Sequence, residues 1–263
     1  MPLPLISIIT INRNNAVGLR RTLASTAEQS CANFEHVVID GASSDESLAV
    51  IQEFRDRLTY AVSERDSGIY NAMNKGIAVA KGKYLLFLNS GDHLLSDTSL
   101  ATAANWLTSA EIVYFNAQLV RPNTGATSHT AFPAKLSFSF FARQSLAHPA
   151  TFIDVDLFKR FGLYDESLQI VSDWKAFLIW VCRHSCSYSA APEVLSVHYL
   201  DGISNNPTSM PILQSERERT LQQEFSAFYQ DYRDARYSSE KLTDLRNNTL
   251  LKLLQRAKLL SEF

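Results

Sequence analysis

The sequence predicts an α/β fold in which helices flank a mostly parallel sheet, and three observations lead to this prediction. Short apolar runs, each about one strand long, alternate with segments whose apolar residues recur at helical spacing. Strand and helix alternate four times up to Leu88, the pattern of a parallel sheet with right-handed crossovers. From Met210 on, Gln, Glu, Arg, Lys and Leu dominate, and this change predicts two helices appended to the sheet domain.

The first part of the chain supplies the four alternating units. Strands are predicted at residues 5–11, 34–39, 58–62 and 84–88, where apolar and β-branched residues dominate. The intervening helices have as inward positions Leu19, Leu23 and Ala27; then Leu48, Ile51 and Phe54; then Ile69, Met73, Ile77 and Ala80. Gly82 follows the third helix, in the position where glycine commonly ends one.

The middle of the chain has a less regular rhythm. A helix is predicted near residues 100–107, a strand at 112–115, two strand-like runs around the turn at 121–125, short and long helices at 157–161 and 172–183, and a last strand at 194–199.

The composition is that of an ordinary soluble globular protein, with 46% hydrophobic and 20% charged residues among 263. A net charge of -2 gives no reason to expect a nucleic acid partner. Three cysteines are a small and odd number that does not suit a disulfide framework, and this favours a reducing, cytoplasmic location. Cys182 and Cys186 lack the second ligand pair of a zinc site, so core packing is expected for them. No signal peptide or membrane-spanning run is expected.

Three aspartates follow three of the predicted strands. Asp40 comes after the second strand, Asp66 after the third and Asp92 after the fourth, at the sheet edge where α/β proteins bind ligands. Any one of them alone would be explained as a loop residue or helix cap. No G-x-x-x-x-G-K-[ST] or G-x-G-x-x-G motif is present, and an acidic edge repels phosphate unless a divalent cation bridges the two. The sequence therefore predicts a metal-bridged nucleotide.

Two further features have competing interpretations. Asp173 lies at the start of a predicted helix, where a carboxylate is favoured by the helix dipole alone. The last helix has basic residues on one side, including Arg246, Lys252 and Arg256. Packing with a solvated basic side is the first expectation for this helix. Homodimer formation and contact with an anionic membrane surface, which would make the protein peripheral at the inner face of the plasma membrane, are the alternatives.

Six spaced motifs resemble the GT-A family 2 of glycosyltransferases, in particular the bacterial members that build surface polysaccharides. They are N-R-N-N, V-V-I-D-G-A-S-S-D, S-E-R-D-S-G-I-Y-N-A-M-N-K-G, G-K-Y-L-L-F-L-N-S-G-D, H-P-A-T-F and S-D-W. The resemblance covers residues 1–205 and implies a GT-A domain there, followed by a helical extension at 206–263. It implies a nucleotide-diphosphate sugar donor, preferably a UDP-sugar, Mn²⁺ or Mg²⁺ as cofactor, and a glycan or undecaprenyl-linked glycan as acceptor.

The resemblance also implies roles for individual residues. The donor would be bound by Ile11, Arg13, Asp40, Asp66, Tyr70, Asn74 and Asn89, with Asp40 accepting a hydrogen bond from the base. Asp92 would hold the metal, with His198 as a second ligand or a core histidine. His148 would line the sugar or acceptor pocket, and Asp173 would be the catalytic base. Asn89-Ser90-Gly91-Asp92 departs from the D-x-D metal motif because only Asp92 is a carboxylate.

These roles imply an inverting mechanism. Asp173 takes the proton from an acceptor hydroxyl that attacks the anomeric carbon, while the cation at Asp92 stabilises the departing diphosphate. Two other functions stay open at this point. A sugar-phosphate nucleotidyltransferase would need a glycine-rich basic loop, for which Arg13, Arg20 and Arg21 are a poor substitute. A non-catalytic nucleotide-sugar binding module would explain the degenerate metal motif.

Overall fold

The computed structural model describes residues 3–247. The chain divides into two compact units, of which the first ends at Glu216 and the second begins at Arg217. The strands are β1 (Ile6–Asn12), β2 (Phe34–Asp40), β3 (Tyr60–Ser63), β4 (Tyr84–Phe87), β5 (His93–Leu94), β6 (Ile112–Val120), β7 (Thr127–His129), β8 (Thr151–Asp154) and β9 (Tyr188–Tyr199). The α-helices are α1 (Ala16–Ala27), α2 (Ser47–Glu53), α3 (Ile69–Val79), α4 (Ser99–Ala104), α5 (Phe138–Phe141), α6 (Val155–Phe161), α7 (Ser172–Cys182), α8 (Met210–Glu224) and α9 (Ser226–Asn247). Short 3₁₀ turns are η1 (Arg55–Arg57), η2 (His148–Ala150), η3 (Ile203–Asn205) and η4 (Pro207–Ser209).

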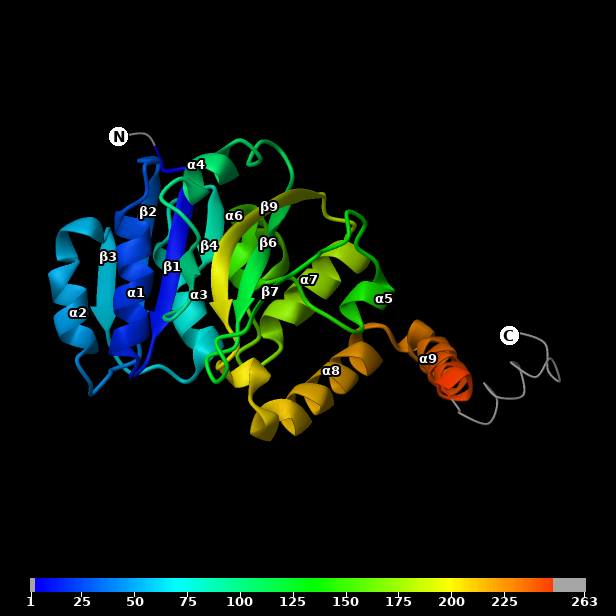
Figure 1. Cartoon of the computed structure of the whole chain (residues 1–263). Coiled ribbons are helices and arrows are strands. Elements are labelled where there is room, and N and C mark those ends of the chain that lie inside the picture. Colours follow the sequence, from blue (N-terminus) through cyan, green and yellow to red (C-terminus); the bar gives the residue numbers. More distant parts are fainter. Residues whose placement is uncertain (1–2, 248–263) are drawn as a thin grey trace. The chain divides into compact units, whose positions relative to one another are not determined.

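One mixed sheet organises the first unit (Figure 1). Its strand order is β3-β2-β1-β4-β8-β6-β9-β5, and β7 pairs with β6. The four strands predicted from the alternating pattern are all parallel and adjacent, which confirms the predicted fold class. Their carboxyl ends therefore meet at one edge.

The other half of the sheet is more irregular than the sequence indicated. β8 is antiparallel to both β4 and β6, β5 is antiparallel to β9, and β6 and β9 run parallel with register shifts near Asn116. β9 begins at Tyr188, six residues before its predicted start at Val194. The residues that precede Val194 include Ala190, Ala191 and Pro192, which have weak strand signals. Pairing with β6 determines their conformation.

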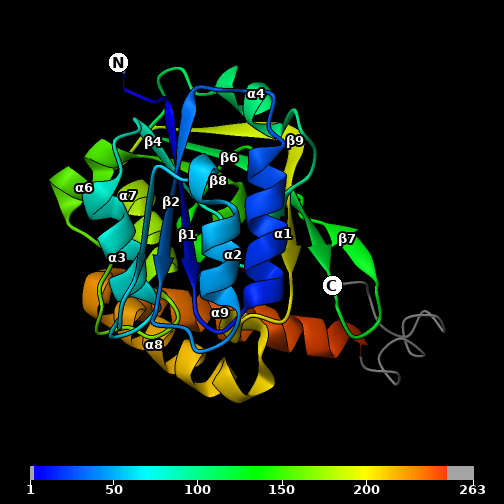
Figure 2. The same cartoon turned by 90° about the vertical axis from the view of Figure 1, so that its left-hand side faces the viewer.

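Alternation along the strands assigns each helix to a face of the sheet. Val38 packs in a cluster with residues of α1 and α2. The next residue, Ile39, points the opposite way and meets Gly76 of α3, as does Ile9 of β1. Figure 2 shows α1 and α2 together, with α3 on the other side of β1 and β2. This packing fixes the start of α3, and with it Tyr70, beside the carboxyl edge.

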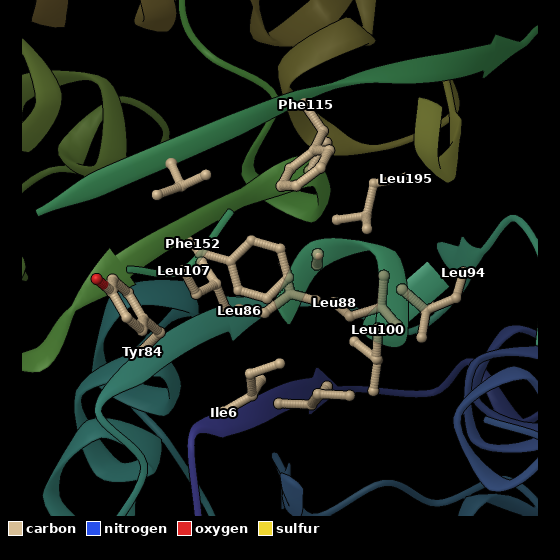
Figure 3. Close-up of a cluster of buried hydrophobic side chains, with 14 of the residues drawn as sticks. Ile6, Tyr84, Leu86, Leu88, Leu94, Leu100, Leu107, Phe115, Phe152 and Leu195 are labelled. Carbon is tan, nitrogen blue, oxygen red and sulfur yellow. The ribbon is translucent and has the colours of Figure 1, made fainter. Parts of the chain in front are cut away.

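A large apolar cluster joins the parallel and antiparallel halves of the sheet (Figure 3). Leu86 from β4, Phe152 from β8 and Phe115 from β6 are fully buried in it, and Leu100 of α4 packs against them. Burial of each such side chain contributes roughly 1.5–3 kcal/mol. The cluster holds β4, which leads into residues 89–92, close to β8, which follows His148, and to β9, which contains His198.

The C-terminal unit was predicted to contribute a basic amphipathic helix. α8 and α9 are helical as expected. The basic and leucine-rich arc that motivated the membrane and dimer alternatives falls mainly on residues 248–263, which lie outside the described residues. Every helix within residues 3–247 is either too short or too polar to span a bilayer.

Candidate functional site

Polar side chains line up across the carboxyl ends of the first three strands. Asn12 of β1 pairs in register with Asp40 of β2, which pairs with Ser63 of β3. The loop after β4 continues this row, because the backbone N–H of Ser90 donates to the carbonyl of Ile11 at 3.1 Å. The predicted site residues at these strand ends therefore share one edge of the sheet.

Asp40 is buried and fully engaged by the protein itself. Its Oδ1 accepts from Asn12 Nδ2 at 2.7 Å and from Ser43 Oγ at 2.6 Å. Its Oδ2 accepts from Ser43 N at 2.9 Å and from Ser63 Oγ at 2.5 Å. Burial alone would raise the pKa of Asp40, but these hydrogen bonds outweigh it and lower the pKa. The carboxylate ties β1, β2 and β3 together and has 0% exposure, so it presents no surface to a ligand.

Asp66 lies directly over the residue that follows Asp40. A Cβ on Gly41 would come within 2.3 Å of Asp66 Oδ2, so only glycine permits this approach. Asp66 Oδ1 accepts from Gly68 N at 3.1 Å and lies 4.0 Å from Arg13 Nη1. The side chain of Arg13 is 68% exposed. The side chain of Asp66 is only 7% exposed, so the Arg13 guanidinium is the exposed polar group of this pair.

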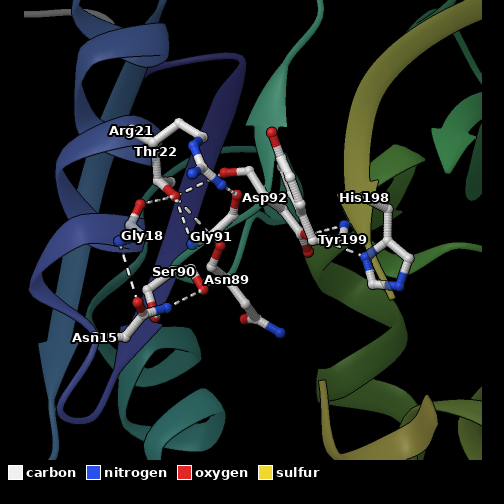
Figure 4. Close-up of polar contacts among 10 residues, drawn as sticks. All are labelled: Asn15, Gly18, Arg21, Thr22, Asn89, Ser90, Gly91, Asp92, His198 and Tyr199. Carbon is white, nitrogen blue, oxygen red and sulfur yellow. Dashed lines mark hydrogen bonds and ion pairs between the residues drawn. The ribbon is translucent and has the colours of Figure 1, made fainter. Parts of the chain in front are cut away.

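Helix α1 clamps the loop that carries Asp92 (Figure 4). Thr22 Oγ1 donates to the carbonyl of Asp92 at 2.6 Å and accepts from Gly91 N at 3.0 Å. Asn15 Nδ2 donates to the carbonyl of Ser90 at 3.0 Å. Gly91 has a φ of 112°, a left-handed conformation that favours glycine. The role of Thr22 in holding this loop was not predicted from the sequence.

Asp92 is joined to the last strand of the sheet. Its Oδ1 lies 2.9 Å from His198 Nδ1 and accepts from Tyr199 N at 3.2 Å (Figure 4). Burial lowers the pKa of His198, but the hydrogen bond and charge of Asp92, with the charge of Asp201, outweigh it and raise the pKa. Asp92 and His198, predicted together as metal ligands, are thus neighbours.

The donor set at Asp92 is compatible with a weakly held divalent cation. Asp92 Oδ2 and His198 Nε2 have no hydrogen-bond partner among the described residues, and the buried Asn89 Oδ1 also lacks one. Within residues 3–247, no group of three His, Cys, Asp or Glu side chains is arranged to hold a metal. Mg²⁺ and Mn²⁺ prefer oxygen ligands, and Mg²⁺ commonly takes several of them from water and substrate phosphates. The residues therefore fit a cation that a diphosphate helps to hold.

Asp173 is the second acidic group of the site and lies in the first turn of α7. Tyr70 Oη donates to its Oδ1 at 2.8 Å, and His148 Nδ1 lies 3.9 Å from its Oδ2. Its side chain is 23% exposed, so the carboxylate is reachable from outside. Helix α7 and helix α3 thus meet at this residue.

His148 is a buried, neutral histidine between these groups. It stacks on Phe87 at 4.6 Å between ring centroids, and its Nε2 lies 2.9 Å from Tyr164 Oη. Burial lowers the pKa of His148, although the charges of Asp173 and Asp92 both oppose that shift. Both carboxylates therefore act on the same imidazole.

Asn74 is occupied in holding the chain segment that leads into α7. Its Nδ2 donates to the carbonyl of Tyr164 at 2.9 Å and to Glu166 Oε1 at 2.8 Å, while its Oδ1 accepts from Tyr164 N at 3.0 Å. The family resemblance implied that Tyr70 and Asn74 approach the donor. In the structure, Tyr70 and Asn74 link α3 to Asp173 and to the segment before it.

Comparison with known proteins decides the family. The model of the family described as Glycosyl transferase family 2 matches residues 7–159, which include β1 to β4 and the loop with Asp92. The chain belongs to this family. Family 2 membership was predicted from six motifs, and the comparison confirms it.

Named relatives of this family 2 chain are about one-third identical to it over the residues that align. A PGL/p-HBAD biosynthesis glycosyltransferase of Mycobacterium bovis is 33% identical over 181 residues, which cover 66% of this chain and 68% of the relative. A glycosyltransferase of Rickettsia typhi, itself described as uncharacterised, is 31% identical over 193 residues, 66% of this chain and 59% of the relative.

Solved structures with the same fold are more distant in sequence. TarS of S. aureus, residues 1–349, has a TM-score of 0.62 at 17% identity, over 82% of this chain and 65% of that one. The same TarS fragment in complex with UDP-GlcNAc gives a TM-score of 0.64 at 16% identity, over 82% and 66%. The mannosyltransferase PcManGT from Pyrobaculum calidifontis, in complex with GDP-Man and Mn²⁺, gives 0.58 at 15% identity, over 96% and 83%. These similarities establish the GT-A fold of the family 2 chain.

Proposed function

We propose that the protein is an inverting glycosyltransferase that moves a sugar from a nucleotide-diphosphate donor to a hydroxyl group of a glycan or lipid-linked glycan. The observation that best supports this is that the protein holds one oxygen of each of two carboxylates, Asp92 and Asp173, and makes no hydrogen bond to the other oxygen among the described residues. The free oxygen of Asp92 could bind a cation, and the free oxygen of Asp173 could accept a proton. Inversion requires only one base and no covalent intermediate.

The donor nucleotide is proposed to bind along the edge from Arg13 to Asp92. Asp66 Oδ2 has no hydrogen-bond partner among the described residues, so it is a better acceptor for an N–H of the base than Asp40, whose oxygens are all engaged. The Arg13 guanidinium can stack on the base. We propose UDP as the nucleotide, which is supported by the TarS complex with UDP-GlcNAc.

Asp92, with His198 beside it, would hold Mn²⁺ or Mg²⁺ together with the donor diphosphate. The bound cation would supply positive charge where negative charge develops on the diphosphate. PcManGT, which was solved with GDP-Man and Mn²⁺, supports this assignment. Asn89 would approach the same phosphates, and His148 would line the sugar or acceptor pocket.

Asp173 is proposed as the general base. Its exposed oxygen, Oδ2, would take the proton of the acceptor hydroxyl as that oxygen attacks the anomeric carbon, and the bond to the diphosphate would break with its electron pair leaving on the diphosphate. General-base catalysis typically contributes 10²–10⁴-fold. For the acceptor, a glycan or glycolipid is supported by the PGL/p-HBAD biosynthesis name of the M. bovis relative.

The test combines binding and turnover. Thermal unfolding is measured with UDP, UDP-GlcNAc, UDP-glucose and GDP-mannose, each with and without Mn²⁺, because a ligand of the folded state raises the melting temperature. Asp173→Asn should keep the thermal shift and lose nucleoside diphosphate release. The exposed Asp156, which pairs with Lys159, provides a matched control as Asp156→Asn. Full turnover by Asp173→Asn would exclude Asp173 as the base, and pyrophosphate release from UTP and a sugar phosphate would favour a nucleotidyltransferase.

A further inference from the structure

The phenol of Tyr70 is a buried polar group that meets the first turn of α7. Tyr70 is 4% exposed, and its Oη donates to Asp173 Oδ1 at 2.8 Å across 103 residues of sequence. Burial, and then the charge of Asp173, raise the pKa of Tyr70 well above its usual 10.0. The phenol therefore keeps its proton and acts as a fixed donor, not as an acid or base.

The second oxygen of Asp173 is placed differently. Among the described residues, no hydrogen bond is made to Oδ2, and His148 Nδ1 lies 3.9 Å from it. The other nitrogen of that ring, Nε2, is already paired with Tyr164 Oη at 2.9 Å. One oxygen is thus held by Tyr70, and the other remains available.

Tyr70 is held rigidly enough to orient its partner. It occupies the first turn of α3, whose Asn74 bonds both the N–H and the carbonyl of Tyr164. Asn71 Nδ2 of the same helix donates to Glu166 Oε2 at 2.9 Å. These bonds fix α3 against the segment that leads into α7, so Tyr70 and Asp173 keep their relative positions.

We propose that Tyr70 is a positioning residue for the general base: its phenol holds Oδ1 of Asp173 so that Oδ2 faces the acceptor hydroxyl. This inference rests on the proposed base role of Asp173. The proton of the acceptor hydroxyl goes to Oδ2, and Tyr70 keeps its own. A carboxylate without the phenol would rotate about its χ angles and present Oδ2 in the productive orientation for only part of the time.

No second side chain can replace the phenol as a donor to Asp173. The groups that surround Asp173 are Tyr70 from α3, His148 from η2 and Tyr164 from the segment after α6. Among the described residues, Tyr70 is the only one that donates directly to the carboxylate from a side chain. Removal of the phenolic oxygen therefore leaves Oδ1 without its side-chain donor and should slow turnover more than it weakens donor binding.

The experiment compares Tyr70→Phe with Tyr84→Phe in the intact chain. Tyr84 is equally buried, and its Oη donates to the carbonyl of Ala110 at 2.9 Å, beside the amino end of β4. The readouts are binding of UDP, and release of UDP or GDP from UDP-GlcNAc, UDP-glucose and GDP-mannose with Mn²⁺ present. Tyr70→Phe should bind UDP within about twofold of the unsubstituted protein and release nucleotide about 10- to 100-fold more slowly. Tyr84→Phe should leave both binding and release unchanged.

Each outcome separates this inference from the proposed function. Unchanged turnover in Tyr70→Phe, together with loss of turnover in Asp173→Asn, would overturn the role of Tyr70 alone. An equal loss of UDP binding and turnover in Tyr70→Phe would show a general structural role and would also overturn it. Full turnover in Asp173→Asn would overturn the base assignment, and the role of Tyr70 with it.

Discussion

Nδ1 of His198 lies 2.9 Å from Oδ1 of Asp92, so β9 and the loop after β4 meet at one carboxylate. Tyr199 N donates to the same oxygen at 3.2 Å. Oδ1 is therefore fixed by two donors from β9, and Oδ2 is the oxygen left for a cation. The lone carboxylate of the Asn89-Ser90-Gly91-Asp92 motif is thus oriented by a residue that lies far along the chain.

The first prediction concerns this orientation. His198→Ala should weaken Mn²⁺-dependent binding of UDP by about 10- to 100-fold, because groups that orient a metal-bound carboxylate have effects of that size. Asp92→Asn should abolish the dependence on Mn²⁺ altogether. Calorimetric titration of UDP with and without Mn²⁺, or after treatment with EDTA, measures both. The exposed His129 on β7 is the control as His129→Ala, and a His198→Ala protein with unaltered Mn²⁺ dependence would contradict the assignment.

The second prediction uses the close approach of Gly41 to Asp66. Gly41→Ala places a Cβ 2.3 Å from Asp66 Oδ2 and 3.5 Å from Arg13 Cδ. Asp66 is a side-chain end that can rotate away, so the free energy of unfolding should change little, whereas binding of UDP should weaken by about tenfold or more as the acceptor is displaced.

A matched control exists in the loop after β9. A Cβ added at Gly202 has no heavy atom within 4 Å, so Gly202→Ala tests the loss of glycine without a clash. Urea unfolding and UDP titration of both variants separate stability from binding. Wild-type affinity in Gly41→Ala would exclude Asp66 from the nucleotide site.

The third prediction is a dependence of stability on pH. His36 is buried between Thr10 and Thr26, with its ring nitrogens 2.9 Å and 3.0 Å from their hydroxyls. Burial lowers the pKa of His36 from 6.5 to about 3, so the folded protein holds this ring neutral. In the unfolded chain the His36 ring takes up a proton below pH 6.5, whereas in the folded protein it stays neutral until about pH 3. The contribution of neutral His36 to the free energy of unfolding is therefore complete above pH 6.5 and is lost as the pH falls towards 3.

The variant that tests this is His36→Gln, which keeps hydrogen-bonding groups but does not titrate. Between pH 6 and pH 4, the free energy of unfolding should fall more steeply in the natural protein than in His36→Gln, by up to ~1.4 kcal/mol per pH unit. Urea unfolding at several pH values gives both slopes. Parallel slopes would mean that the ring is already charged in the folded state.

The sequence predicted the parallel half of the fold because each strand there is a continuous apolar run followed by a helix. It could not predict the antiparallel half, because β5 has two residues and β8 has four, and their pairings are decided by partners far along the chain. Asp40 illustrates the same limit within the site. Its position after β2 was readable, but its inward orientation depends on Asn12, Ser43 and Ser63, which come from three segments.

The helical pattern of α3 predicted its apolar face but not its polar one. The predicted inward face, with Met73 and Ile77, is buried as expected. Tyr70 and Asn74 are buried on another side of the helix, and no periodicity separates a tyrosine that contacts a donor from one that contacts a carboxylate 103 residues away. Tyr70 and Asn74 recur four residues apart beside the apolar face, and this spacing was the one indication in the sequence that a second segment packs against α3.

The fourth prediction tests that second face of α3 through Asn74. Asn74→Ala removes the bonds to both backbone groups of Tyr164 and leaves them buried, which should lower the free energy of unfolding by about 1–3 kcal/mol. Asn74→Asp still accepts from Tyr164 N, but it places a carboxylate against the Tyr164 carbonyl and Glu166 Oε1, which Asn74 Nδ2 contacts at 2.8 Å. Asn74→Asp should therefore be less stable than Asn74→Ala at pH 8 and should regain stability as the pH is lowered.

Urea unfolding at pH 8 and pH 5 measures this, with the exposed Asn105 changed to Ala as control. Equal stability of Asn74→Asp and the natural protein at pH 8 would contradict this role of Asn74, because its amide N–H bonds would then contribute nothing to holding α3 against the segment before α7.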